Sequence, residues 1–179
     1  MKQMKSVRSI QDLYIDQLRD LHSMTSQVAL SLPKLGATAA NEELRTLILM
    51  HGDETDHQRA IVMEIFARRG EDPGSDRCKA VAGLIEGGDK HLANATVPPI
   101  RDLMMIAHCL RIEHYEIAAY EITARLAERL GLDAEAQILS ELLSEQDRMA
   151  VGLLELESRI FVAAGDDGEA NLGDSDPKQ

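Results

Sequence analysis

Apolar residues recur at spacings of three and four along four long stretches of the chain, as they do in amphipathic helices. On the first stretch, the apolar stripe includes Tyr14, Leu18 and Leu21. The four stretches are residues 9–35, 41–69, 99–130 and 133–163. The pattern therefore predicts four long helices and an all-α protein.

Residues typical of helix ends lie at the borders of these stretches. Asn41 precedes two glutamates and suits the start of the second helix, while Pro99 suits the first turn of the third. Gly131 suits the residue that follows a helix. A shorter helix is expected at 77–94, within the long connection between the second and third helices.

Four long helices joined by two short turns and one long middle connection predict a ferritin-like four-helix bundle. In this arrangement the middle connection is a crossover that contains the short extra helix. An up-down bundle remains an alternative, because the connection is long enough to fold back.

Composition narrows the functional classes. The 179 residues fit one domain, and 19 basic against 31 acidic residues give a net charge of −12. This charge argues against nucleic-acid binding and against anionic membrane surfaces. Two cysteines, no leader segment and no membrane-spanning stretch predict a cytoplasmic protein. We expect a folded domain over 1–164 and a disordered acidic tail over 165–179.

Every apolar stripe is interrupted near its middle by polar residues at positions where the core is expected. A buried carboxylate destabilises the fold unless it is paired or binds a metal ion. The interruptions are Thr25 on the first helix, His51 and Glu54 on the second, Glu113 on the third and Glu145 on the fourth.

Two further candidate ligands lie one turn beyond these positions. His57 follows Glu54 at a spacing of three, which places both on one helix face, and Glu116 follows Glu113 in the same way. Carboxylates and imidazole suit iron and manganese, so the set predicts a metal site. One alternative is a buried polar network without metal, in which the acids pair with the histidines or with Arg111. The other is that one helix presents a different face to the core than the stripe predicts.

Specific runs of sequence carry a resemblance to a known family. They include DLYIDQLRDL at 12–21, HGDETDH at 51–57 and RIEHYEIAAY at 111–120. Over residues 7–160 the chain resembles the YciF/YciE-type bacterial stress proteins, a ferritin-like family of uncertain function.

The resemblance implies a stress-associated homodimer with a carboxylate-bridged di-metal centre like that of rubrerythrins, holding two irons or iron and manganese. Matched position by position, it implies a set of five metal ligands. These are Glu54, His57, Glu113, Glu116 and Glu145.

Thr25 departs from the family pattern, which has a glutamate ligand at this position of the first helix. A hydroxyl is a poor iron ligand, so the loss leaves three outcomes open. His22, one turn earlier, substitutes as a ligand, or the site holds one metal only, or it holds none.

Two functions follow as hypotheses. The first is a di-iron or iron–manganese oxidoreductase, peroxidase-like, that acts on peroxide or oxygen. The second is a non-enzymatic structural or interaction protein that keeps the ferritin-like scaffold with a degraded or absent metal site.

Overall fold

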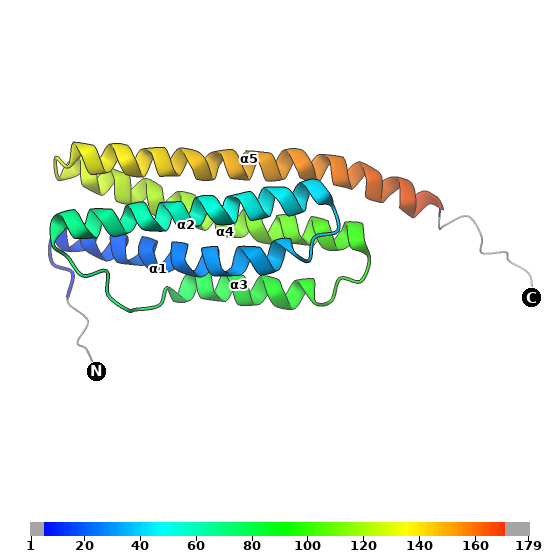
Figure 1. Cartoon of the computed structure of the whole chain (residues 1–179), viewed down its shortest axis with the longest axis horizontal. Helices are drawn as coiled ribbons and strands as arrows, with labels where there is room; N and C mark the ends of the chain where they lie inside the picture. The colour runs from blue at the N-terminus through cyan, green and yellow to red at the C-terminus, as the bar shows by residue number, and fades with distance from the viewer. Residues whose placement is uncertain (1–5, 171–179) are drawn as a thin grey trace, which may run out of the picture.

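The computed structural model describes the backbone of residues 6–170 and the side chains of residues 6–162. All regular structure in this part of the chain is helical, as predicted (Figure 1). The helices are α1 (Ile10–Gly36), α2 (Glu42–Arg69), α3 (Lys79–Leu92), α4 (Pro98–Arg129) and α5 (Asp133–Ala170). The expected tail from residue 165 overlaps α5 as far as Ala170, and residues 171–179 lie outside the described part.

The long helices pack as two sequential pairs, α1 with α2 and α4 with α5. The pairs meet because α1 also packs on α4 and α2 on α5, while α3 covers α1 and α4. Helices α2 and α4 run in the same direction, so the connection at 70–97 returns along the length of the molecule (Figure 1). An up-down arrangement, which requires these two helices to be antiparallel, is not adopted.

Helix ends form where the sequence supplies capping groups. The Ser9 hydroxyl accepts a hydrogen bond from the backbone N–H of Asp12 and starts α1. The Asn41 side chain accepts one from the N–H of Leu44 and starts α2. Gly70 ends α2 with φ of 64°, a left-handed conformation that glycine adopts without strain.

A buried carboxylate of α4 fixes the turn between α1 and α2. Asp102 is 2% exposed and accepts hydrogen bonds from the backbone N–H groups of Ala40 at 2.9 Å and Asn41 at 2.7 Å. Both N–H groups lie just before α2 and lack a helical partner, so Asp102 supplies the acceptors they need. The contact joins one sequential helix pair to the other.

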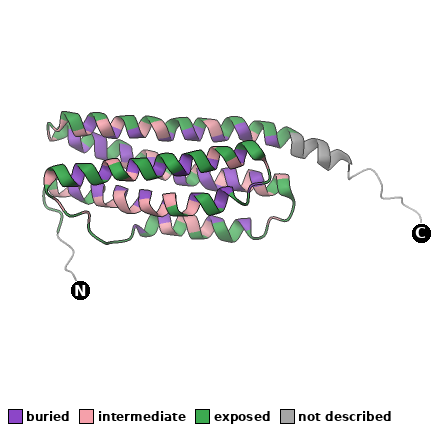
Figure 2. Ribbon diagram, in the orientation of Figure 1, coloured by how far each residue is buried: buried purple, intermediate pink, exposed green. Residues whose placement is uncertain are grey.

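The opposite end of the molecule is closed by a second polar contact. Glu135 of α5 accepts a hydrogen bond from the Tyr14 hydroxyl of α1 and pairs with Arg69 of α2 at 3.1 Å. The Arg69 guanidinium also lies over the Tyr14 ring, 5.2 Å from its centre. Between the two ends, the sides of the helices that face one another are buried (Figure 2).

Helix α3 approaches α4 closely at one glycine. Gly88 packs against the ring of His108, which is 4% exposed. A Cβ atom at Gly88 would stand 1.9 Å from the ring Nδ1, so only glycine fits at this position.

Across the described residues, no helix combines the length and apolarity that crossing a lipid bilayer requires.

Candidate metal centre

Three ionisable side chains meet in the middle of the protein. His51 comes from α2, and Glu113 and Glu116 come from α4 at a spacing of three, which places both on one face of that helix. One candidate ligand atom of each residue lies within 4.8 Å of the others. His51 and Glu113 are 1% exposed and Glu116 is fully buried. The cluster is therefore shielded from solvent.

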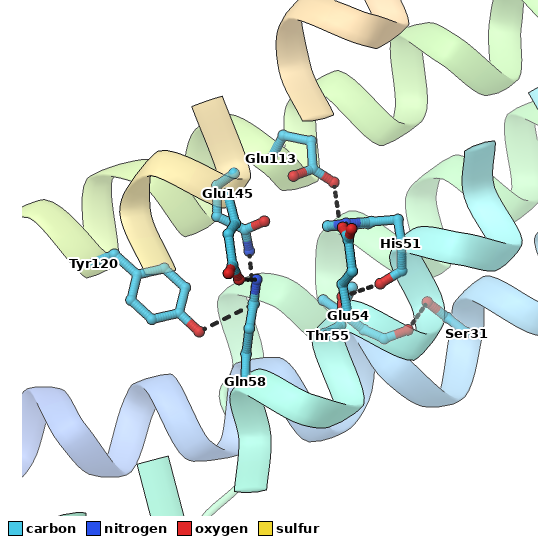
Figure 3. Close-up of polar contacts among 10 residues, drawn as sticks. Ser31, His51, Glu54, Thr55, Gln58, Glu113, Tyr120 and Glu145 are labelled. Carbon is cyan, nitrogen blue, oxygen red and sulfur yellow. Dashed lines mark hydrogen bonds and ion pairs between the residues drawn. The ribbon is translucent and has the colours of Figure 1, made fainter. Parts of the chain in front are cut away.

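The cluster contains more buried acceptors than donors. His51 Nε2 lies 3.0 Å from Glu113 Oε1 (Figure 3), although neither ring nitrogen makes an aligned hydrogen bond with a residue that the structure describes. The other Glu113 oxygen and both Glu116 oxygens are buried without a hydrogen-bond partner among the described residues. Buried carboxylate oxygens are costly unless a donor or a cation satisfies them. A bound cation would satisfy all three.

The surroundings of Glu116 and His51 favour the protonated form of each when no metal is bound. Burial raises the pKa of Glu116 well above its usual value, and the charge of Glu113 raises it further. Burial by itself lowers the pKa of His51, but the contact with Glu113 and the charges of Glu116 and Glu54 raise it to about 9. The charges of the neighbouring carboxylates therefore govern the protonation of both His51 and Glu116.

The metal-free protein is expected to lose stability as the pH rises. Both pKa values are raised in the folded state, so the stabilisation is complete below the unfolded pKa values. The Glu116 part is lost as the pH rises above the ordinary value for glutamate, and the His51 part as the pH passes from the ordinary value for histidine toward about 9. Urea denaturation with chelator present at pH 6 to 9, in steps of about one unit, measures the change. A free energy of unfolding that is flat over this range would contradict the expectation, and Glu116→Gln should reduce the slope.

A second polar network lies beside the cluster and is centred on Gln58. The Gln58 Oε1 accepts from the Tyr120 hydroxyl and from Gln146 Nε2, each at 3.3 Å, and its Nε2 donates to Glu145 Oε2 at 2.9 Å (Figure 3). Glu145 is half-buried and is held by an amide. Most of this network is neutral, in contrast to the cluster.

The structure separates the five predicted ligands. Glu113 and Glu116 lie in the cluster, and Glu145 lies in the Gln58 network. Glu54 and His57 are exposed on α2, so the expectation that Glu54 faces the core is wrong. The side chains that α2 buries here are His51, Thr55 and Gln58, at spacings of four and three.

Thr25 is fully buried on α1, as expected for its place on the stripe. Its hydroxyl donates to the carbonyl oxygens of Leu21 at 2.9 Å and His22 at 3.2 Å, so its proton is used within its own helix. His22 is half-buried and meets Phe66 edge-on, with ring centres 6.3 Å apart. It is not a member of the described cluster.

The donor set fits one cation better than two. Ferritin-like di-metal centres are built from about four carboxylates and two histidines. The described cluster brings together two carboxylates and one imidazole. Three protein ligands can hold one divalent ion and leave coordination positions open.

Comparisons with known proteins agree with the fold and with the motifs. The family model described as "Domain of unknown function (DUF892)" matches residues 9–164. Protein YciF of Escherichia coli (strain K12) is 31% identical over 152 residues, which cover 84% of this chain and 92% of that protein.

Solved structures of similar proteins also match this chain over most of its length. The crystal structure of the E. coli stress protein YciF matches with a TM-score of 0.83 and 30% identity, covering 87% of this chain and 98% of that one. YcfI from Rhodopseudomonas palustris matches with a TM-score of 0.80 and 29% identity, covering 84% of this chain and 96% of that one. A protein of Xanthomonas campestris pv. campestris, at 20% identity and a TM-score of 0.72, shares the fold and covers 90% of this chain and 99% of that one.

Proposed function

The chain belongs to the DUF892 family, and from that premise we propose that it is a YciF-like stress protein that binds one divalent metal ion. The ligands are His51, Glu113 and Glu116. The single observation that carries the proposal is the set of three buried carboxylate oxygens that lack any hydrogen-bond partner among the described residues. A bound cation offsets the free-energy cost of burying these oxygens, whereas without metal the protonated forms of His51 and Glu116 are favoured.

The proposal includes a ferritin-like four-helix bundle, formed by α1, α2, α4 and α5, with α3 in the crossover. The parallel course of α2 and α4 supports this arrangement, as do the contacts between the two helix pairs. Bundles of this kind place their metal ligands on the inward faces of opposite helices. His51 on α2 and the two glutamates on α4 match that placement.

Iron or manganese suits these ligands, and when bound it supplies redox chemistry toward peroxide or oxygen. The chain's own contribution is to exclude water and to hold the ligands. His51 and Glu113 are almost fully buried, and the Tyr120 hydroxyl is held by Gln58 beside the cluster. The open coordination positions are the feature that an oxidant-handling enzyme needs. A second metal lacks comparable ligands among the described side chains, so we propose a mononuclear site.

Metal analysis tests the proposal directly. The protein is purified without chelator, and iron, manganese and zinc per chain are measured before and after anaerobic loading with Fe(II). We expect about one ion per chain and a melting temperature that rises with added metal, because a ligand of the native state stabilises it. No uptake and no change in melting temperature would overturn the metal site.

A metal-free scaffold is the second candidate function. The Gln58 network favours it, because Gln58 makes hydrogen bonds with Tyr120, Gln146 and Glu145 there without a cation. Thr25 favours it as well, since its hydroxyl is used within α1. In that case the family fold serves a structural or interaction role, and the loading experiment returns no metal.

We also propose that two copies of the chain associate. Leu30 on α1 is 83% exposed and borders a groove of about 700 Å³ that includes the small residues Ala29 and Gly52. A two-fold axis would place the leucine of each copy in the groove of the other. Light scattering is expected to give twice the chain mass of 19.7 kDa. A mass of one chain at micromolar concentration would contradict the association.

A further inference from the structure

The two ring nitrogens of His51 face carboxylates of different kinds. Nε2 lies 3.0 Å from Glu113 Oε1 inside the cluster, and Nδ1 lies 3.6 Å from Glu54 Oε2. Glu54 follows His51 by three residues on α2, and its side chain is 55% exposed. His51 therefore spans the distance between a solvent-exposed carboxylate and a buried one.

We infer that Glu54 is a positioning residue for the metal site, which accepts the Nδ1–H of His51 and so directs Nε2 toward the ion. The inference rests on the proposed function and deepens it. It gives Glu54 a role different from that of the direct ligand implied by the family resemblance.

The Nδ1 atom of His51 needs an acceptor. It is buried and makes no hydrogen bond with the described residues. The nearby Thr55 hydroxyl donates its proton to the His51 carbonyl at 2.7 Å. A gap of 3.6 Å is longer than a hydrogen bond, but the exposed Glu54 side chain can close it by a small rotation. The negative charge of Glu54 also polarises the Nδ1–H bond of the imidazole, which favours ligation of a metal ion through Nε2.

Glu54 is poorly placed to be a ligand itself. The two nitrogens of an imidazole ring point in divergent directions, so an oxygen beside Nδ1 is remote from an ion bound at Nε2. The unpartnered oxygens of Glu113 and Glu116 lie on the buried side. Histidines that bind metals commonly donate their other N–H to a carboxylate, which fixes the tautomer and raises the basicity of the ligand.

Zinc and cobalt titrations of full-length variants test the inference. Glu54→Ala should weaken Zn²⁺ binding by about 10- to 100-fold, as outer carboxylates of metal sites do when removed. Glu54→Gln keeps an acceptor oxygen and should lose less. Glu64→Ala removes an equivalent exposed charge from α2 and should bind like the parent protein. Circular dichroism checks that each variant is folded.

Spectroscopy separates a positioning role from direct ligation. With Co²⁺ bound, Glu54→Ala should keep the visible absorption bands of the parent protein, because the ligands are unchanged. With Zn²⁺ bound, the Nδ1–H of His51 should give a slowly exchanging NMR signal that the variant loses.

Each outcome decides a different question. Binding by the parent protein with no loss in Glu54→Ala overturns the positioning role and leaves the metal site intact. Changed cobalt bands in Glu54→Ala overturn it in favour of direct ligation. A parent protein that takes up no metal overturns both the positioning role and the proposed function.

Discussion

Replacing Glu116 with glutamine is expected to reduce metal uptake from about one ion per chain to none. Glu116 is fully buried, and neither of its oxygens has a hydrogen-bond partner among the described residues. An amide of the same shape has no charge to offer a cation, so the site is left with His51 and one carboxylate. Metal analysis after anaerobic Fe(II) loading measures the loss.

The same substitution should stabilise the metal-free protein. The amide removes a buried group whose raised pKa makes ionisation costly, and its NH₂ can donate to the unpartnered oxygen of Glu113. We expect a gain of about 1 kcal/mol at pH 8, and a smaller gain as the pH is lowered and protonation of Glu116 removes the cost of its buried charge. Urea denaturation with chelator present measures it.

Glu128→Gln provides the matched control, because it makes the same change at an exposed position of α4. It should leave both metal content and stability unchanged. A Glu116→Gln protein that still holds about one ion per chain would show that the ligand set is wrong.

Replacing Gly88 with alanine is expected to destabilise the protein by about 2–3 kcal/mol, the upper part of the range for overpacked cores. The new methyl group would stand 1.9 Å from Nδ1 of His108, so α3 must move away from α4 or the ring must leave its site. The better helix propensity of alanine offsets only about 1 kcal/mol of this cost. Urea denaturation of the variant measures the difference.

Neighbouring glycines on the same helix give the controls. No atom of the described residues lies within 4 Å of a Cβ added at Gly83 or Gly87, so alanine there should be neutral or stabilise the protein by up to about 1 kcal/mol. Adding His108→Ala to Gly88→Ala should recover part of the loss, because it removes the atoms that clash. A Gly88→Ala protein as stable as Gly87→Ala would contradict the close approach.

The helices were predictable because their signals are local. Stripe spacing and caps such as Asn41 and Gly131 depend only on neighbouring residues, and the first four helices begin and end within two residues of the predicted bounds. Helix α5 was predicted to end at residue 163 but continues to Ala170, so the prediction of a disordered tail is wrong for residues 165–170. The contact between Gly88 and His108 was not predictable, because it depends on how two distant helices cross.

The glutamates of α4 and the core position of His51 were predicted, but the rest of the buried polar face of α2 was not. Leu44, Ile48, Val62 and Ile65 are all buried, and their spacing of four and three leads to positions 51, 55 and 58. A stripe drawn instead through Leu47 and Ile61 leads to Glu54, because one position turns the helix by about 100°. The middle of α2 is polar on both faces, so hydrophobicity alone could not decide. The burial of Gln58 was not predictable in the same way, because a neutral amide is not among the residue types that typically mark a metal site.

His51 belongs to the α1–α2 hairpin, whereas Glu113 and Glu116 belong to the α4–α5 hairpin. Each hairpin is joined by a short turn and can form through contacts that are local in sequence. The complete ligand set exists only after the two hairpins dock across the 70–97 connection. Metal binding would therefore stabilise the docked arrangement of the two hairpins and slow their separation during unfolding. It would add nothing to the formation of either hairpin alone.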